Sequence, residues 1–250
     1  MMKKIYNARI VSNARAVDNL FKLVVELDDM LNARPGQFVQ LKIPSNEFTL
    51  RRPLGIASLD GNLLTMFYRT VGRGTQFLST VEQNAQLDLI APLGNGFNVL
   101  DGEKVLLVGG GVGLAPLLYS ARSFNNADIL IGGKTRSEAE MWTVGFKGAV
   151  DEMFVTTDDG SLGVKGFVSD LLPTVLSKKH YDAVLVCGPP IMMKNVSALV
   201  AQHNIRCEVS MENRMACGLG ACLSCSIDTV DGRKKVCKDG PVFDARKIIW

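Results

Sequence analysis

The sequence predicts a β domain, an α/β domain and a small cysteine-bearing domain, in that order, and three observations support this. Residues up to about 100 consist of short β-rich runs with turn signals between them. From residue 103, strand-like apolar runs alternate with helix-like stretches. Residues 217–237 hold four closely spaced cysteines. The predicted domains are therefore 1–100, 101–206 and 207–250.

The composition limits the possible functions. The 250 residues suffice for about two domains and a small third. The net charge of +3 comes from scattered side chains, and no run of Lys or Arg favours a nucleic-acid partner. The longest apolar stretches have the length of strands, too short to span a bilayer. The two histidines, His180 and His203, lie beside no candidate nucleophile, which disfavours hydrolytic chemistry.

The first residues of the chain lack the apolar core of a secretory signal. We therefore expect a cytoplasmic protein whose thiols are reduced.

The first segment is expected to form a small antiparallel barrel. Turn signals such as Arg34-Pro35-Gly36 and Asp60-Gly61-Asn62 separate its β-rich runs. Several short strands with regular turns and no helical period are typical of such barrels. The expected strands are Lys4–Val11, Phe21–Leu27, Gln37–Ile43, Leu63–Thr70 and Gln86–Ala91.

Within the barrel segment, Arg51, Arg52 and Pro53 are expected to follow a strand. An arginine fixed beside a rigid proline suits a phosphate, which it binds through charge-assisted bonds. An aromatic pair, a further cation and exposed backbone amides follow, and they can supply a stacking surface and an anion nest. The alternative is a solvated, salt-bridged surface. The further candidates are Phe67, Tyr68, Arg69, Gly74 and Thr75.

The second segment is expected to form a parallel sheet with helices between its strands. Its first strand, Lys104–Val108, leads into a glycine loop and a helix that reaches about Phe124. Alternation of strands and helices implies parallel pairing with crossovers. The later strands and helices are Asp128–Ile131, Glu152–Thr156, Phe167–Ser177, Ala183–Cys187 and Pro190–His203.

The glycine loop is a candidate dinucleotide site. Gly109, Gly110, Gly111 and Gly113 follow a strand, and Pro116 fits the first turn of the next helix. Glycines allow close backbone approach, and a helix N-terminus offers N–H groups to a pyrophosphate. The alternative is a tight turn needed only for packing.

The loop departs from the usual dinucleotide fingerprint because Pro116 replaces its third glycine. No acidic residue ends the next strand, so a carboxylate that binds the ribose is not evident. Lys134 and Arg136 can hold a 2′-phosphate instead, so the choice between NAD and NADP as the nucleotide stays open.

A later strand ends in Cys187, Gly188 and Pro189. The carboxyl ends of the strands form the ligand crevice of an open α/β sheet, and Gly188 permits close approach there. The alternative is a plain turn with a buried thiol.

Cys217, Cys222, Cys225 and Cys237 have the C-x4-C-x2-C…C spacing of a plant-type [2Fe–2S] cluster. Structural zinc sites usually pair their ligands as two knuckles or mix in histidine, and neither pattern occurs here. Disulfides are disfavoured by the expected reducing compartment. The remaining thiols, at 187 and 207, are expected to be buried and free.

Together these motifs resemble those of the ferredoxin reductase-like flavoproteins. The chain has R-x-P in the barrel, G-G-G-x-G-x-A-P after the first parallel strand and C-G-P after a later one. Within that family, the tail M-E-N-R-M-A-C-G-L-G-A-C and the later C-K-D-G-P-V-F resemble the electron-transfer subunits of dihydroorotate dehydrogenase B. The match covers essentially the whole chain.

The resemblance implies FAD, a [2Fe–2S] cluster and NAD as cofactors. It also implies a partner: an FMN-binding catalytic subunit that oxidises dihydroorotate to orotate in pyrimidine biosynthesis, in a heterotetramer with two copies of each chain. It places the four cysteines on the cluster and makes Cys187 a candidate for the nicotinamide side. The implied flavin contacts are Arg52, Pro53, Leu54, Gly55, Phe67, Tyr68, Arg69, Gly74 and Thr75.

One position departs from the family pattern. Gly55 stands where the family usually has Ser or Thr, so a hydroxyl near the flavin is missing, and a backbone amide or Ser58 is the expected substitute. Alternative functions remain at this point. One is the flavin subunit of a ferredoxin:NADP oxidoreductase or of a sulfide- or sulfite-reducing complex. Another is a non-enzymatic iron–sulfur redox sensor.

Overall fold

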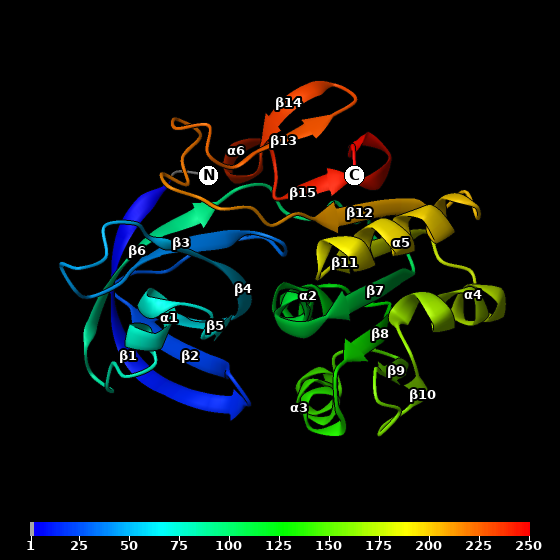
Figure 1. Ribbon diagram of the computed structural model, residues 1–250, viewed down its shortest axis with the longest axis horizontal. Helices are drawn as coiled ribbons and strands as arrows, with labels where there is room; N and C mark the ends of the chain where they lie inside the picture. The colour runs from blue at the N-terminus through cyan, green and yellow to red at the C-terminus, as the bar shows by residue number, and fades with distance from the viewer. Residues whose placement is uncertain (1–2) are drawn as a thin grey trace.

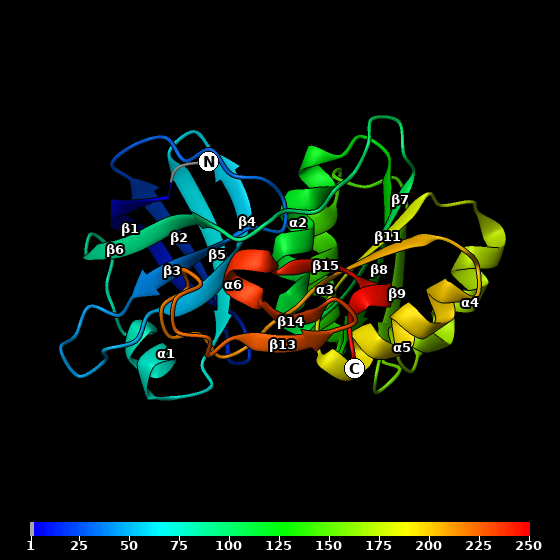
Figure 2. The same ribbon diagram turned by 90° about the horizontal axis from the view of Figure 1, so that it is seen from above.

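The computed structural model describes residues 3–250. A β-barrel lies beside an α/β domain, and the C-terminal segment lies over both (Figure 1). Seen from above, the red and orange elements cover the junction between the two larger parts (Figure 2). The predicted architecture of barrel, parallel sheet and small C-terminal domain is confirmed.

The barrel is closed, with strand order β1-β2-β5-β4-β3-β6 and antiparallel pairing throughout. Alternation of side chains fills its interior; in β2, for example, Phe21, Leu23 and Val25 are core residues. The only helix between its strands is short. The elements are β1 (Lys4–Val17), β2 (Leu20–Leu27), β3 (Phe38–Lys42), β4 (Arg52–Asp60), β5 (Leu63–Arg69), α1 (Arg73–Leu78) and β6 (Gln86–Leu93).

The α/β domain is built on a seven-stranded sheet with order β10-β9-β8-β7-β11-β12-β15. All neighbours pair in parallel except β12 and β15. Its first six strands are β7 (Val105–Gly110), β8 (Ala127–Gly133), β9 (Met153–Thr157), β10 (Val164–Lys165), β11 (Ala183–Cys187) and β12 (Arg206–Ser210). Its helices are η1 (Gly111–Gly113), α2 (Leu114–Ser123), α3 (Arg136–Phe146), α4 (Val168–Lys178) and α5 (Pro190–Ala201).

Helices cover both faces of this sheet, so its central strands are apolar on both sides. In β7, Val105 and Leu107 pack with residues of α2 and α3. The alternate residues, Leu106 and Val108, pack with residues of α4 and α5. This explains why the strand reads as a continuous apolar run in the sequence. Within residues 3–250, no helix has the length and apolarity needed to cross a bilayer.

The C-terminal segment is attached to the edge of the sheet. Its strand β15 pairs with β12, where Val209 lies opposite Phe243. A small apolar cluster joins it to the outer face of the barrel, through Phe38 and Leu93 on the barrel side. The elements are β13 (Ser226–Thr229), β14 (Gly232–Lys235), α6 (Val236–Asp239), β15 (Val242–Asp244) and η2 (Ala245–Lys247).

Several expected elements have different bounds. The first strand runs on to Val17, and the arginine–proline motif lies inside a strand, β4, rather than after one. Helix α3 was not expected. The predicted boundary at 206 falls at the start of β12, which is part of the parallel sheet. The division into three domains at the stated residues stays a prediction.

Barrel and α/β domain meet where β4 packs on α2. A Cβ added at Gly55 would lie 3.4 Å from Cδ of Pro116, at the limit of ordinary contact. Tyr119 of the same helix donates a hydrogen bond of 2.8 Å to the carbonyl of Ala33. The two motif residues Gly55 and Pro116 therefore form part of the domain interface.

Candidate functional site

The four cysteines of the expected cluster lie in two pairs. Cys217 and Cys222 belong to the loop that follows β12, and Cys222 is exposed. Cys225 and Cys237 are buried in the small cluster of apolar residues next to the barrel. Cys237 comes from α6, which the hairpin β13–β14 brings back to the loop.

Hydrogen-bond donors surround these sulfur atoms. The backbone N–H of Leu219 donates to Sγ of Cys217 at 3.3 Å, and that of Cys237 donates to Sγ of Cys225 at 3.4 Å. The hydroxyl of Ser224 lies 3.2 Å from Sγ of Cys222. Such donors orient thiolate ligands and stabilise their charge.

The pKa values of the Cys217, Cys222 and Cys237 thiols are shifted in different directions. The Ser224 hydroxyl and nearby backbone N–H groups lower the pKa of the exposed Cys222 thiol to about 6. For Cys217, burial raises the pKa, but the N–H of Leu219 and other backbone donors outweigh it and leave the pKa lowered. Burial and the neighbouring Cys225 thiol raise the pKa of Cys237 to about 12.

Two adjacent cysteine pairs fit a binuclear cluster, in which each iron takes two thiolates. Each pair has a backbone N–H aimed at one of its sulfur atoms, so the four cysteines fit the ligand set of a [2Fe–2S] cluster.

The candidate flavin motifs from two parts of the barrel lie together. Arg52 starts β4, and its Nη1 donates to the carbonyl of Leu50 at 2.5 Å. A Cβ added at Gly74 in α1 would overlap the guanidinium, with Cζ of Arg52 at 2.9 Å. Thr75 supports this corner, because its hydroxyl oxygen accepts hydrogen bonds from the N–H groups of Val71 at 3.0 Å and Gly72 at 3.3 Å. The site thus joins a cation to the amides of a helix start.

The two aromatic candidates have protein neighbours. Phe67 packs on Trp142 of α3, with ring centroids 4.9 Å apart. Tyr68 lies inside the barrel, stacked on Phe21 at 5.5 Å, and its hydroxyl donates to Oδ1 of Asn13 at 2.8 Å. Burial raises the pKa of Tyr68 to about 12. Their role in flavin binding stays a prediction.

Arg69 also has protein partners. Its Nη2 forms an ion pair with the buried carboxylate of Glu138 in α3, and its Nη1 donates to Oδ1 of Asn19 at 2.7 Å. A Cβ at Gly111 would lie 3.7 Å from the same guanidinium. The pair therefore joins the barrel to the glycine loop. Sequence reasoning missed Glu138, because no local pattern marks a partner 69 residues away.

The loops after β7 and β11 are in contact at the carboxyl edge of the sheet. A Cβ at Gly113 would lie 2.6 Å from the carbonyl oxygen of Cys187 and 2.6 Å from the backbone nitrogen of Gly188. One at Gly110 would lie 3.6 Å from Cδ of Pro189. The structure thus brings the two expected nucleotide motifs together at the edge where α/β sheets bind ligands.

We expect Gly113→Ala to lower the free energy of unfolding by about 1–3 kcal/mol, because the added methyl group meets backbone atoms that cannot move aside. Gly145→Ala is the matched control. Gly145 lies in helix α3, and a Cβ added there would lie 3.9 Å from Cδ2 of Leu118, an ordinary contact. Within a helix, alanine is more stable than glycine by about 0.5–1 kcal/mol. Urea unfolding measures both; equal stability of the two variants would contradict the packing argument.

Cys187 ends β11 and is 1% exposed. Burial raises the pKa of its thiol, and the nearby Glu212 carboxylate raises it further, so the group is a neutral thiol at neutral pH. Its backbone lies beside Gly109 of β7 and Ser210 of β12. The residue therefore lies at the ligand edge, with its side chain packed in protein.

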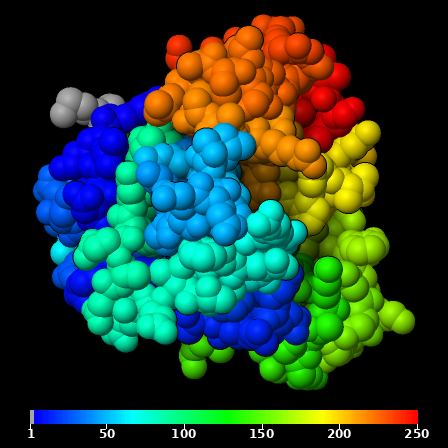
Figure 3. All heavy atoms as spheres, turned by 60° about the vertical axis from the view of Figure 1, so that its left-hand side comes forward, coloured from blue at the N-terminus to red at the C-terminus, as the bar shows by residue number. Residues whose placement is uncertain are grey.

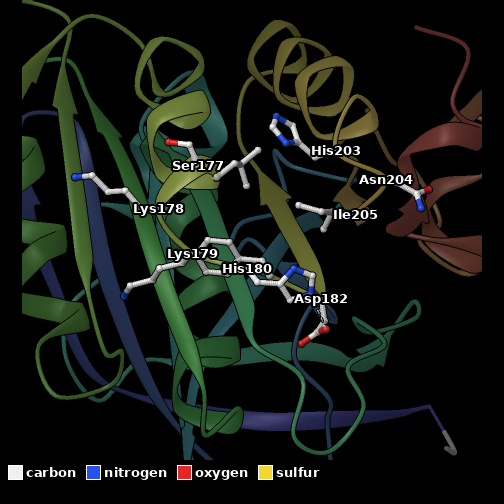
Figure 4. A pocket seen from close by; sticks show the side chains of 10 residues that line it. Ser177, Lys178, Lys179, His180, Asp182, His203, Asn204 and Ile205 are labelled. Carbon is white, nitrogen blue, oxygen red and sulfur yellow. Dashed lines mark ion pairs between the residues drawn. The ribbon is translucent and has the colours of Figure 1, made fainter.

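Another recess lies at the opposite, amino-terminal edge of the sheet, with a volume of about 480 Å³. Figure 4 shows His180, which follows α4, and His203, which follows α5, among its lining residues. Its charged groups have partners: Lys179 pairs with Asp128 at 3.0 Å, and His180 lies 3.5 Å from Asp182. This recess is remote from the motifs described above.

Comparisons with known proteins agree with this geometry. Residues 212–249 match the family model of the iron–sulfur cluster binding domain of dihydroorotate dehydrogenase B. The chain is 39% identical over 253 residues to the electron transfer subunit of dihydroorotate dehydrogenase B (NAD(+)) from Clostridium acetobutylicum, covering 99% of each chain. It is 36% identical over 260 residues to the Streptococcus pneumoniae subunit, covering 99% of this chain and 100% of the other.

Among solved structures, an NADH-dependent reduced ferredoxin–NADP oxidoreductase matches with a TM-score of 0.85 and 28% identity, over 97% of this chain and 90% of that one. A ferredoxin reductase of carbazole 1,9a-dioxygenase shares the fold, with a TM-score of 0.71 and 21% identity, over 82% of this chain and 67% of the other. Full-length identity to named relatives and a match of the cysteine segment point the same way, and the chain belongs to the family of dihydroorotate dehydrogenase B electron-transfer subunits.

Proposed function

We propose that this chain transfers electrons between an FMN-binding catalytic subunit, which oxidises dihydroorotate to orotate, and NAD⁺. The cofactors are a [2Fe–2S] cluster held by Cys217, Cys222, Cys225 and Cys237, and an FAD in the barrel. The cluster exchanges single electrons, the flavin one or two, and the nicotinamide a hydride, which is why a flavin belongs between the other two.

The observation that carries the proposal is the contact between the cysteine loop and the barrel. A Cβ at Gly218 would lie 2.5 Å from Cγ of Gln40 in β3. In the barrel register Gln40 lies opposite Pro53, in the arginine–proline motif of β4. The cysteine loop therefore rests on β3, and the arginine–proline motif belongs to the adjacent strand β4. This proximity supports short-range electron transfer between the cluster and the flavin.

The remaining site residues are proposed in the following roles. Arg52 holds a phosphate of FAD, beside the amides of Gly74 and Thr75. Pro53, Leu54, Gly55, Phe67, Tyr68 and Arg69 shape the flavin site. The nucleotide binds at the carboxyl edge of the sheet, where the backbone of two loops approaches it closely, at Gly109, Gly110, Gly111, Gly113, Pro116, Gly188 and Pro189.

We expect Cys187→Ala to slow the reduction of FAD by NADH about tenfold. The space left by the buried thiol lets the backbone at Gly188 shift, and with it the nicotinamide moves from its reactive position. Stopped-flow absorbance under anaerobic conditions measures the step. Cys207→Ala, which removes the other buried free thiol outside the cysteine segment, is the control. An unchanged rate in Cys187→Ala would remove this residue from the nicotinamide site.

The proposed partner face is the exposed side of the cysteine loop. Cys222, Leu219 and Leu223 are exposed there, the two leucines by 44% and 62%. Figure 3 shows the orange segment that contains them at the surface, beside barrel residues in light blue. We further propose a heterotetramer with two copies of each subunit, as the family resemblance implies, and a cytoplasmic location.

The test is an absorbance spectrum of anaerobically purified protein, followed by titration with NADH and by turnover with the FMN subunit and dihydroorotate. The proposal expects flavin and iron–sulfur bands, both bleached by NADH, and NAD⁺ reduction that depends on dihydroorotate. Cluster absorbance without flavin and without response to NADH would favour the sensor function instead.

A second candidate is the flavin subunit of a ferredoxin:NADP oxidoreductase. The match to the solved NADH-dependent reduced ferredoxin–NADP oxidoreductase favours it, at a TM-score of 0.85 over 97% of this chain. Electron transfer to ferredoxin, with no activity on dihydroorotate in the presence of the FMN subunit, would select this candidate.

A further inference from the structure

Gln40 is a polar side chain buried where the barrel meets the cysteine loop. It is 0% exposed and occupies the middle of β3. Its strand neighbours Val39 and Leu41 fill the barrel interior, so Gln40 lies on the outer face, as does Phe38. Phe38 packs there with Cys225 and Cys237. The outer face of β3 is therefore the surface on which the cysteine segment rests.

The Gln40 side chain is in direct contact with the cysteine loop. A Cβ at Gly218 would lie 2.5 Å from Cγ and 2.6 Å from Nε2 of Gln40. Gly218 follows Cys217 directly, and its φ of +68° suits glycine. The loop therefore passes over the carboxamide with no side chain between them.

The polar atoms of Gln40 lack adequate partners in the protein. Its Oε1 is buried and accepts no hydrogen bond within residues 3–250. Its Nε2 has one contact, 3.6 Å from the thioether sulfur of Met215, which is a weak acceptor. The amide nitrogen carries two N–H donors, and only one of them has this weak acceptor within residues 3–250. The other N–H is therefore free to donate to a bound acceptor.

The main chain at this position is fixed. Arg51 donates from Nη1 to the carbonyl of Gln40 at 3.3 Å and to Oδ1 of Asp88 at 2.7 Å. The partially exposed Arg51–Asp88 pair therefore ties β3 to β6 beneath the loop. A strand held on both sides presents its carboxamide in a constant position.

We propose that Gln40 is a positioning residue for the iron–sulfur cluster. An N–H of its side-chain carboxamide donates a hydrogen bond to a sulfur atom of the cluster or of its cysteine ligands. This rests on the proposed function, since it requires the cluster. Hydrogen bonds to the sulfurs help set the reduction potential of such clusters. A donor stabilises the more negative, reduced cluster, so Gln40 raises the potential and favours electron entry.

The test compares Gln40→Met with the wild type in the complex with the FMN subunit. Methionine has a similar volume and no N–H. We expect the ratio of reduced to oxidised cluster at a fixed potential to fall about tenfold, a shift of about 59 mV for one electron. A redox titration followed by EPR measures it. Gln86→Met, at the exposed start of β6, is the matched control.

A second measurement detects the hydrogen bond directly in the wild type, with the variant as its control. Protein with ¹⁵N in its glutamine side chains should show a nitrogen coupling in the pulsed EPR spectrum of the reduced cluster, and Gln40→Met should lose it. A purely structural role would leave the wild type without this coupling. Its absence, or an unchanged potential in a cluster-containing variant, overturns the inference. Wild-type protein without any cluster would instead overturn the proposed function.

Discussion

Replacing Cys222 by serine should stop electron transfer from dihydroorotate to NAD⁺, while FAD and NADH still react with each other. We expect NAD⁺ reduction by dihydroorotate to fall at least about 100-fold, because one cluster ligand is missing. Reduction of FAD by NADH should persist, since the flavin motifs lie on β4, β5 and α1. Cys222 is exposed, so the change should leave the fold intact. Two rates are measured. One is the steady-state rate of NAD⁺ reduction by dihydroorotate in the presence of the FMN subunit (coupled turnover), and the other is the stopped-flow rate of FAD reduction by NADH.

Cys207→Ser is the control for this experiment. Cys207 lies in β12, on the α5 side of the sheet and outside the cysteine loop, so its variant should retain coupled turnover. If Cys222→Ser kept full coupled activity while its iron content showed no cluster, electrons would pass without the cluster and the proposed path would be wrong.

The two experiments on the cysteine segment address different properties. Loss of Cys222 removes a ligand, and loss of the Gln40 amide changes the energy of electron entry while the four ligands remain. A variant at position 40 that also lost its cluster would resemble the first experiment, which is why the nitrogen coupling is measured on the wild type. Together they separate the presence of the cluster from its potential.

The sequence predicted the parts of the fold that have local causes. Continuous apolar runs gave the central strands, and Ala183–Cys187 matches β11 at both ends. Runs of glycine between a strand and a helix predicted the loop after β7, because few other residues allow the backbone to approach so closely. Cysteine spacing predicted the chemistry of the C-terminal segment, since thiolates at those intervals suit one kind of cluster.

The parts that the sequence did not predict depend on register and on distant contacts. The arginine–proline motif was expected to follow a strand, yet Arg52 and Pro53 pair with Leu41 and Gln40 as part of β4. Phe67 and Tyr68 were expected to offer a stacking surface. The structure packs them into two different cores, because successive strand residues face opposite sides.

Gln40 shows the same limitation at the candidate site. Its contact with Met215 spans 175 residues of sequence, and no local pattern distinguishes it from the nearby Gln37. Gln37 has its amide satisfied, donating to the carbonyl of Gly94 at 2.7 Å and accepting from the N–H of Arg34 at 2.8 Å. The difference in hydrogen bonding between the two glutamines arises only from tertiary packing.

Gly74→Ala should weaken FAD binding while leaving the cluster in place. The added Cβ would overlap the guanidinium of Arg52, with Cζ at 2.9 Å, and so would displace the cation from the helix start. Loss of one hydrogen bond to a charged group costs about 1.5–3 kcal/mol, which corresponds to about 10- to 100-fold in affinity. Titration of FAD-depleted protein with FAD, followed by flavin fluorescence, measures the change.

The matched control for this variant lies two residues away. A Cβ at Gly72 would meet no atom within 4 Å, and φ there is −168°, an extended conformation that alanine adopts freely. Gly72→Ala should therefore bind FAD as the wild type does. If both variants bound FAD normally, the position of the Arg52 guanidinium beside Gly74 would not contribute to FAD affinity. If both lost FAD equally, the general shape of the turn would matter rather than the guanidinium.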